Sequence, residues 1–147
     1  MTTRTLQFDA YIENTPETVM RYIADVRNRP LFLPLLRAVS DITGDTFVPG
    51  ATWRWSWAVL GMEFEGIGRC LSYQPGHEYA FRTEGGIGST WTYRAVAERT
   101  GTKLTVDIAY EVPEKALVRL PSETVLEALR KSEASKATQN LKAILDK

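Results

Sequence analysis

Apolar and polar residues alternate along most of this chain, and the pattern changes at only a few places. Residues 6–12 place Leu6, Phe8, Ala10 and Ile12 between more polar neighbours, which predicts a half-buried strand. Between residues 39 and 112, apolar side chains again recur at every second position, and glycine-containing turns interrupt them. Successive side chains of a strand point to opposite faces, so this stretch is typical of an antiparallel meander with one apolar face.

Two segments between the first strand and the meander predict short helices. Residues 14–17, Asn-Thr-Pro-Glu, supply a capping residue, a proline suited to the first helical turn and an acid near the positive helix end. We expect this helix to end near Asn28, because Pro30 disfavours helical geometry in the residue before it. The run LFLPLLRAV at residues 31–39 predicts a second helix, with Pro34 near its start or at a break.

A long helix is predicted at the end of the chain, from Ser122 and Glu123 to about Leu145. The element order is therefore strand, two short helices, six strands and a long helix, without repeats or a linker, which predicts a single domain over residues 1–147. We assign the chain to the α+β class. We expect a curved antiparallel sheet of about seven strands whose concave face is covered by the C-terminal helix.

The segment WRWSW at residues 53–57 aims three indole rings at one face of a strand. A two-residue turn at Leu60–Gly61 would place Trp57 opposite Phe64, and Trp55 and Trp53 opposite Gly66 and Gly68. Two interpretations remain open. The glycines let the sheet bend and the indoles fill the space, or the indoles line a ligand pocket.

Several short motifs resemble one superfamily when they are taken in this order and spacing. They are residues 14–19 at the first helix, 25–30 leading to Pro34, 49–53 opening one strand and 101–104 opening the last. The chain resembles the START-like helix-grip superfamily, specifically the polyketide cyclase/dehydrase group also called SRPBCC. The resemblance implies a deep apolar cavity between the sheet and the C-terminal helix. It implies no shared catalytic residue, so function must be argued from the cavity.

The leading functional hypothesis is therefore that the protein binds a small hydrophobic ligand. This ligand would be either aromatic or isoprenoid/lipid-like. The alternative is an aromatase/cyclase-type enzyme that shapes its substrate, with Glu133 or a pocket tyrosine handling protons. A third hypothesis, a partner-binding module, requires residues 31–36 to form an exposed apolar patch. The candidate ligand-binding residues are Trp53, Trp55, Trp57, Phe64, Phe81, Trp91, Tyr93, Tyr110, Leu129 and Glu133.

Glu133 interrupts the apolar stripe of the predicted terminal helix, between Leu129 and Ala137. A buried, unpaired carboxylate is costly, so this side chain must reach water, a cation or a polar ligand group. It either points out at a wet pocket mouth or faces the pocket. In the second case its pKa should rise, and it becomes the candidate acid or base.

Composition and charge narrow the choice of partners, cofactors and cellular location. The 18 basic and 18 acidic side chains cancel, which argues against a nucleic-acid or anionic-membrane partner. The single cysteine, Cys70, is expected to be a buried apolar filler, and the single histidine, His77, lies in a turn, so we expect no metal and no cofactor. Without a membrane-length apolar run or a signal sequence, we expect a cytosolic protein. Residues 85–88 are interpreted as a mobile loop that gates the pocket.

Overall fold

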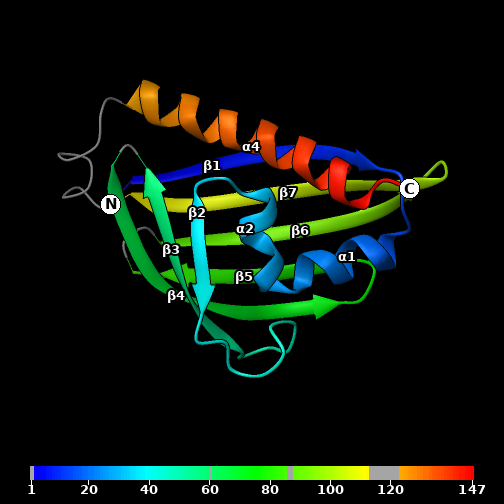
Figure 1. The fold of residues 1–147 in the computed structure, drawn as a ribbon, viewed down its shortest axis with the longest axis horizontal. Helices are drawn as coiled ribbons and strands as arrows, with labels where there is room; N and C mark the ends of the chain where they lie inside the picture. Colours follow the sequence, from blue (N-terminus) through cyan, green and yellow to red (C-terminus); the bar gives the residue numbers. More distant parts are fainter. Residues whose placement is uncertain (1, 60, 86–87, 113–122) are drawn as a thin grey trace.

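The computed structural model describes residues 2–59, 61–85, 88–112 and 123–147. Its seven strands are β1 (Thr2–Ile12), β2 (Leu36–Ser40), β3 (Thr52–Val59), β4 (Met62–Gln74), β5 (Glu78–Glu84), β6 (Gly88–Glu98) and β7 (Gly101–Val112). The helices are α1 (Pro16–Ala24), the 3₁₀ turn η1 (Val26–Asn28), α2 (Arg29–Phe32) and α4 (Glu123–Leu145). The strands form a curved sheet, and the helices lie over one of its faces (Figure 1). The predicted α+β helix-grip architecture is confirmed.

All seven strands belong to one antiparallel sheet with the order β1-β7-β6-β5-β4-β3-β2. Sequential strands from β2 to β7 are neighbours, and β1 closes the sheet by pairing with β7. The predicted register of the tryptophan strand is also confirmed, because Trp57 lies opposite Phe64, Trp55 opposite Gly66 and Trp53 opposite Gly68. Leu60 of the predicted turn and Ser122 at the predicted start of the terminal helix lie outside the described residues.

The two helices after β1 are shorter than the sequence predicts. Thr15 caps α1 by accepting a hydrogen bond from the Thr18 amide, and α1 ends at Ala24, before the predicted Asn28. The prediction of a helix over residues 31–39 is wrong. Helix α2 ends at Phe32, the next residue Leu33 has extended backbone, and Leu36–Ser40 forms strand β2 instead. Pro34 explains the early end, because a proline disfavours helical geometry in the residue before it.

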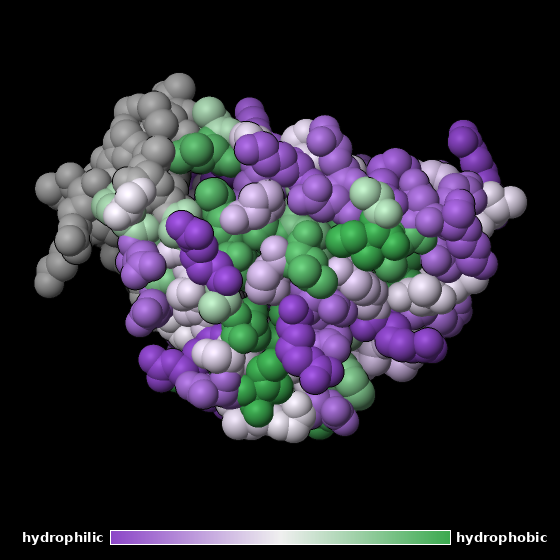
Figure 2. Space-filling model, in the orientation of Figure 1, coloured by the Kyte–Doolittle hydropathy of each residue, from purple (hydrophilic) through white to green (hydrophobic). Residues whose placement is uncertain are grey.

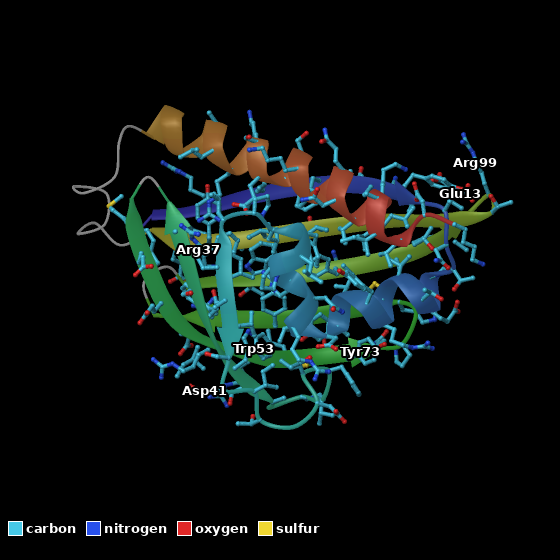
Figure 3. The ribbon with its side chains drawn as sticks, viewed as in Figure 1. Glu13, Arg37, Asp41, Trp53, Tyr73 and Arg99 are labelled. Atoms are coloured by element: carbon cyan, nitrogen blue, oxygen red, sulfur yellow. The ribbon has the colours of Figure 1, made fainter. Side chains whose placement is uncertain are left out.

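The C-terminal end of α4 is tied to the end of β1 by several hydrogen bonds. The Glu13 amide donates to Asp146 Oδ1 at 2.8 Å, and Asn14 Nδ2 donates to the Leu145 carbonyl at 2.9 Å. The Lys147 amide donates in turn to the Glu13 carbonyl at 3.0 Å. Figure 3 shows Glu13 at this corner, beside the end of the helix. We call these contacts the C-terminal clasp.

The hydrophobic core lies between the helices and the inner face of the sheet. The alternation predicted this inner set, and Phe81, Leu104 and Val106 are among its fully buried members. Most of the visible surface is hydrophilic, with hydrophobic residues gathered along its middle (Figure 2). Among the described residues, no helix is long and apolar enough to cross a membrane.

The apolar run at residues 31–36 belongs mainly to this core. Phe32, Leu33 and Leu36 are buried, while Leu31 keeps 64% of its surface exposed. A partner-binding patch built from this run would require several of these side chains at the surface. Burial of three of them therefore removes the basis of the third hypothesis.

Candidate functional site

A layer of aromatic rings covers the inner face of the sheet. The rings of Trp57 and Trp91 are stacked with centroids 6.4 Å apart. Trp91 also stacks on Phe81 at 5.8 Å and on Tyr93 at 6.2 Å. Ring separations of about 4.5–7 Å favour mutual packing. The strand alternation thus brings four of the ten candidate residues into one continuous apolar surface.

A small cavity lies between this layer and α4. It is lined by Leu6, Phe8, Leu33, Trp57, Trp91, Ile108, Arg130, Glu133 and Ala134. Its volume is about 20 Å³, which is room for about one water molecule. Small-molecule sites usually measure about 300–1,000 Å³. By itself this cavity is too small for a ligand, and a ligand bound here would need additional space between the sheet and α4.

Glu133 faces this cavity, so the interpretation of a side chain that simply points into water does not describe it. One carboxylate oxygen accepts a hydrogen bond from the Leu35 amide at 2.9 Å. Burial raises the pKa of Glu133, while the bond from Leu35 and the charge of Arg130 oppose that rise. The side chain therefore both ties α4 to the loop before β2 and places a proton-binding group in the cavity wall.

Arg130, one turn before Glu133, is a second polar group in the cavity wall that the sequence interpretation missed. Its guanidinium carbon lies 4.3 Å from the centroid of the Tyr110 ring. Burial lowers the pKa of Arg130, and the charge of Glu133 opposes the change. The sequence contained a signal, because Arg130 lies four residues after Leu126 and three before Glu133, on the same helical stripe.

Arg29 is a third polar group near the cavity that was missed. It opens α2, only 3% of its surface is exposed, and Nη1 donates a hydrogen bond to the Tyr93 hydroxyl at 3.0 Å. Its guanidinium carbon lies 4.5 Å from the ring centroids of both Phe81 and Trp91. No local pattern indicates this burial, because it results from contacts with Phe81 on β5 and with Trp91 and Tyr93 on β6.

The ten candidate residues occupy three kinds of position. Trp57, Trp91 and Glu133 line the cavity. Trp53, Trp55, Phe81, Tyr93 and Tyr110 are buried in the core, and Phe64 and Leu129 are half-buried. Trp53 points from β3 into the interior (Figure 3), and its ring meets Phe81 edge-on at 5.5 Å. One indole of WRWSW thus lines this cavity and two fill the bend.

The remaining candidate groups lie away from the cavity lining. Cys70 is buried and its pKa is raised by burial, which suits an inert apolar filler. His77 is exposed. Within the described ranges, no group of three or more His, Cys, Asp or Glu side chains is arranged to hold a metal ion. The proposed gating loop at residues 85–88 falls partly outside the described residues, because residues 86 and 87 are not included.

A second hollow, of about 570 Å³, lies on the opposite, outer side of the sheet. It is lined by Arg54, Glu65, Gly66, Ile67, Arg69, Leu71, Arg82, Glu84 and Gly85. Charges of both signs alternate there, and Arg82 is paired with Glu84 at 3.6 Å and Glu111 at 3.4 Å. These charges differ from the apolar lining typical of small-molecule sites, so the cavity under α4 is the better candidate.

Comparison with known protein families agrees with this geometry. Residues 3–146 match the family model described as polyketide cyclase / dehydrase and lipid transport. The chain belongs to this family. At the family level, its members are associated with hydrophobic ligand binding or polyketide cyclisation. A sequence search of the curated proteins found no match.

Solved structures share the fold at low sequence identity. A protein of Thermus thermophilus is 16% identical with a TM-score of 0.76, over 95% of each chain. The Zhui aromatase/cyclase from a Streptomyces species is 15% identical with a TM-score of 0.74, over 97% of this chain and 93% of that one. Major latex-like protein 151 from Panax ginseng is 13% identical with a TM-score of 0.71, over 97% of each chain.

Proposed function

We propose that this protein binds a small hydrophobic molecule, aromatic or isoprenoid-like, between the sheet and α4. One observation carries the proposal: the cavity under α4 has the stacked rings of Trp57 and Trp91 on one side and Glu133 and Arg130 on the other. Apolar walls with a few well-placed polar groups are the usual composition of ligand sites. Family membership supports the same general activity.

The position of two tryptophans in the cavity wall provides the test. Native mass spectrometry of freshly purified protein should reveal a retained hydrophobic molecule. Titration with a panel of aromatic, isoprenoid and fatty-acid compounds should then quench or shift tryptophan emission, because Trp57 and Trp91 line the site. If no compound of any of these classes changes the emission, the proposal is wrong.

A matched pair of alanines on α4 separates cavity binding from nonspecific association. Ala134 lines the cavity, whereas Ala128 is exposed on the same helix. Ala134→Leu fills space that the ligand needs, and affinity should fall at least about tenfold, equivalent to about 1.4 kcal/mol. Ala128→Leu adds the same atoms outside the site and should leave affinity unchanged. Equal effects of the two substitutions would contradict binding under α4.

Aromatase/cyclase chemistry is the second candidate, and Glu133 is the observation that favours it. A carboxyl group whose pKa is raised by burial keeps its proton to a higher pH than an exposed carboxyl group does, which suits a general acid. Glu133→Gln should leave the affinity of a pure binder nearly intact. A cyclase that depends on Glu133 should instead lose about 10²–10⁴-fold in turnover of a poly-β-ketone substrate.

A further inference from the structure

Arg29 places a positive charge in the interior, directly over the aromatic layer. Its guanidinium carbon is equidistant, at 4.5 Å, from the ring centroids of Phe81 and Trp91. A cation within about 6 Å of a ring face is attracted by the ring, and the attraction grows when water is excluded. The two rings thus hold the guanidinium against the inner face of the sheet, with 3% of the residue exposed.

The hydrogen-bonding capacity of this guanidinium is mostly unused. A guanidinium has five N–H donors, but among the described residues its only hydrogen bond is the one from Nη1 to the Tyr93 hydroxyl. The fully buried side-chain atoms without a partner, within the described part of the chain, are Tyr22 Oη and Trp55 Nε1. No nitrogen of Arg29 is among these atoms, although only 3% of the residue is exposed.

No carboxylate of the described residues lies within ion-pairing distance of Arg29. Glu133 is close enough for the charge of Arg29 to influence it, but one of its oxygens already accepts the bond from the Leu35 amide. Buried charges are normally paired, because removing a charge from water is costly. The rings compensate only part of that cost, and within the described residues this cation has no anionic partner.

Arg29 and the cavity both adjoin the ring of Trp91. Trp91 carries the guanidinium of Arg29 and also forms part of the cavity wall. Arg130 lines the cavity and Arg29 lies against the ring of Trp91, so two guanidinium groups are near the single carboxylate of Glu133. The charge around the cavity therefore favours a negative group on a ligand bound there.

We propose that the ligand carries an anionic oxygen group, such as a carboxylate, which accepts hydrogen bonds from the unused N–H groups of Arg29. Its apolar body lies on Trp57 and Trp91. Arginine suits this role because its planar fork matches a carboxylate and stays charged at every physiological pH. The inference rests on the proposed function and specifies the class of ligand.

Ligand pairs that differ only in charge test the inference. Oleic acid with oleamide, and 1-naphthoic acid with 1-naphthamide, are titrated into the protein at pH 7.5, with tryptophan emission and calorimetry as readouts. The acid should bind about tenfold or more tightly than its amide, as expected for hydrogen bonds to a charged acceptor. Equal affinity within each pair overturns the inference but leaves the proposed function standing. If no member of either pair binds, both fail for these ligand classes.

Substitutions of Arg29 identify the group responsible. Arg29→Met keeps the approximate length and the apolar stem of the arginine side chain but removes the charge. The affinity for the acid should therefore fall to the level of the affinity for the amide, and the affinity for the amide should not change. Arg37→Met removes the same charge from an exposed position on β2 and should preserve the preference for the acid. Retention of that preference in folded Arg29→Met would overturn the assignment.

Arg29→Lys provides a second test in case the methionine variant does not fold. It keeps the positive charge but loses the bidentate fork. Affinity for the acid should fall several-fold while affinity for the amide stays constant, with folding monitored by near-ultraviolet circular dichroism. An unchanged ratio of the two affinities would contradict a direct contact between Arg29 and the ligand.

Discussion

The indoles of Trp53 and Trp55 occupy the space left by two glycines. A Cβ atom at Gly68 would overlap the indole of Trp53, and one at Gly66 would overlap both Trp55 and the Glu84 carbonyl. The large residues and the missing side chains lie opposite each other in the β3–β4 register. The tight fit explains why these two rings pack in the core, whereas Trp57, opposite Phe64, reaches the cavity.

Gly68→Ala should therefore destabilise the protein by roughly 1–3 kcal/mol, as expected for overpacking a core. The free energy of unfolding from urea titration measures the effect. Trp53→Leu should recover part of the loss when combined with Gly68→Ala, because the smaller side chain makes room for the added methyl group. Gly88→Ala is the matched control, since its nearest neighbour is the flexible tip of Arg82 at 3.2 Å. Similar losses at both glycines would contradict this explanation.

The pKa of Glu133 makes stability depend on pH. Because burial raises this pKa above its ordinary value of 4.5, the folded protein binds the proton more tightly than the unfolded chain does. The resulting stabilisation is fully present below pH 4.5 and is lost as the pH rises through the folded-state pKa. The free energy of unfolding of the wild type, relative to Glu133→Gln, should fall over that window.

Urea titrations of both proteins between pH 4 and pH 8 test this expectation. A difference that stays flat or grows with pH would show that burial does not raise this pKa. Glu127→Gln removes a carboxylate from an exposed position on the same helix, and its difference from the wild type should show no comparable decrease.

At the scale of elements, sequence patterns predicted what depends on local chemistry and on strand alternation. The cap of α1, the inner face of the sheet and the β3–β4 register could all be derived from them. The segment 31–39 could not, because a dense apolar run has no clear period and fits a buried helix or a buried strand equally well. The pairing of Leu36 with Trp57 makes residues 36–40 the strand β2. This contact joins residues that are distant in the sequence, so no local pattern could predict it.

The same difference between local patterns and tertiary contacts explains which residues of the candidate site could be predicted. Glu133 could be singled out because it interrupts an apolar stripe, and Arg130 carries the same local signal. Arg29 carries none, because its burial depends on Phe81 and Trp91, which are distant in the sequence. The small size of the cavity was also unpredictable, since it depends on how closely α4 approaches the sheet.

The start of α1 illustrates how much one local interaction contributes to the free energy of unfolding. Thr15 Oγ1 accepts the Thr18 amide at 3.3 Å, which satisfies one of the free amides of the first turn. Thr15→Ala should reduce the free energy of unfolding by about 1 kcal/mol, measured by urea titration. Thr15→Ser retains the hydroxyl and should stay close to the wild type. Equal losses in the two variants would assign the effect to the methyl group instead of the cap.

At the scale of the whole molecule, the contacts of the described residues hold α4 unequally along its length. Its C-terminal end is fixed by the C-terminal clasp to residues 13 and 14. Beside the cavity, the bond between Glu133 and the Leu35 amide ties the helix to the rest of the protein. We therefore expect the helix to swing away from the sheet at the cavity while its C-terminal end stays in place.

Hydrogen exchange should reveal this asymmetry. Amides of residues 130–134 should exchange faster than those of residues 141–145 in the free protein, because the latter adjoin the clasp. A bound ligand should slow exchange mainly in the first group. Uniform exchange along α4, or protection confined to its C-terminal end, would contradict opening at the cavity.

The pairing of β1 with β7 also sets the order of events during synthesis. Thr2 lies opposite Val112 and Ile12 opposite Thr102, so β1 has no partner until nearly the whole sheet has been made. At roughly 5–20 residues per second, a nascent β1 waits for several seconds, and pairing across such a long loop is slow in itself. The aromatic layer remains uncovered even longer, because α4 follows β7. The first strand of this sheet to leave the ribosome is thus among the last to pair.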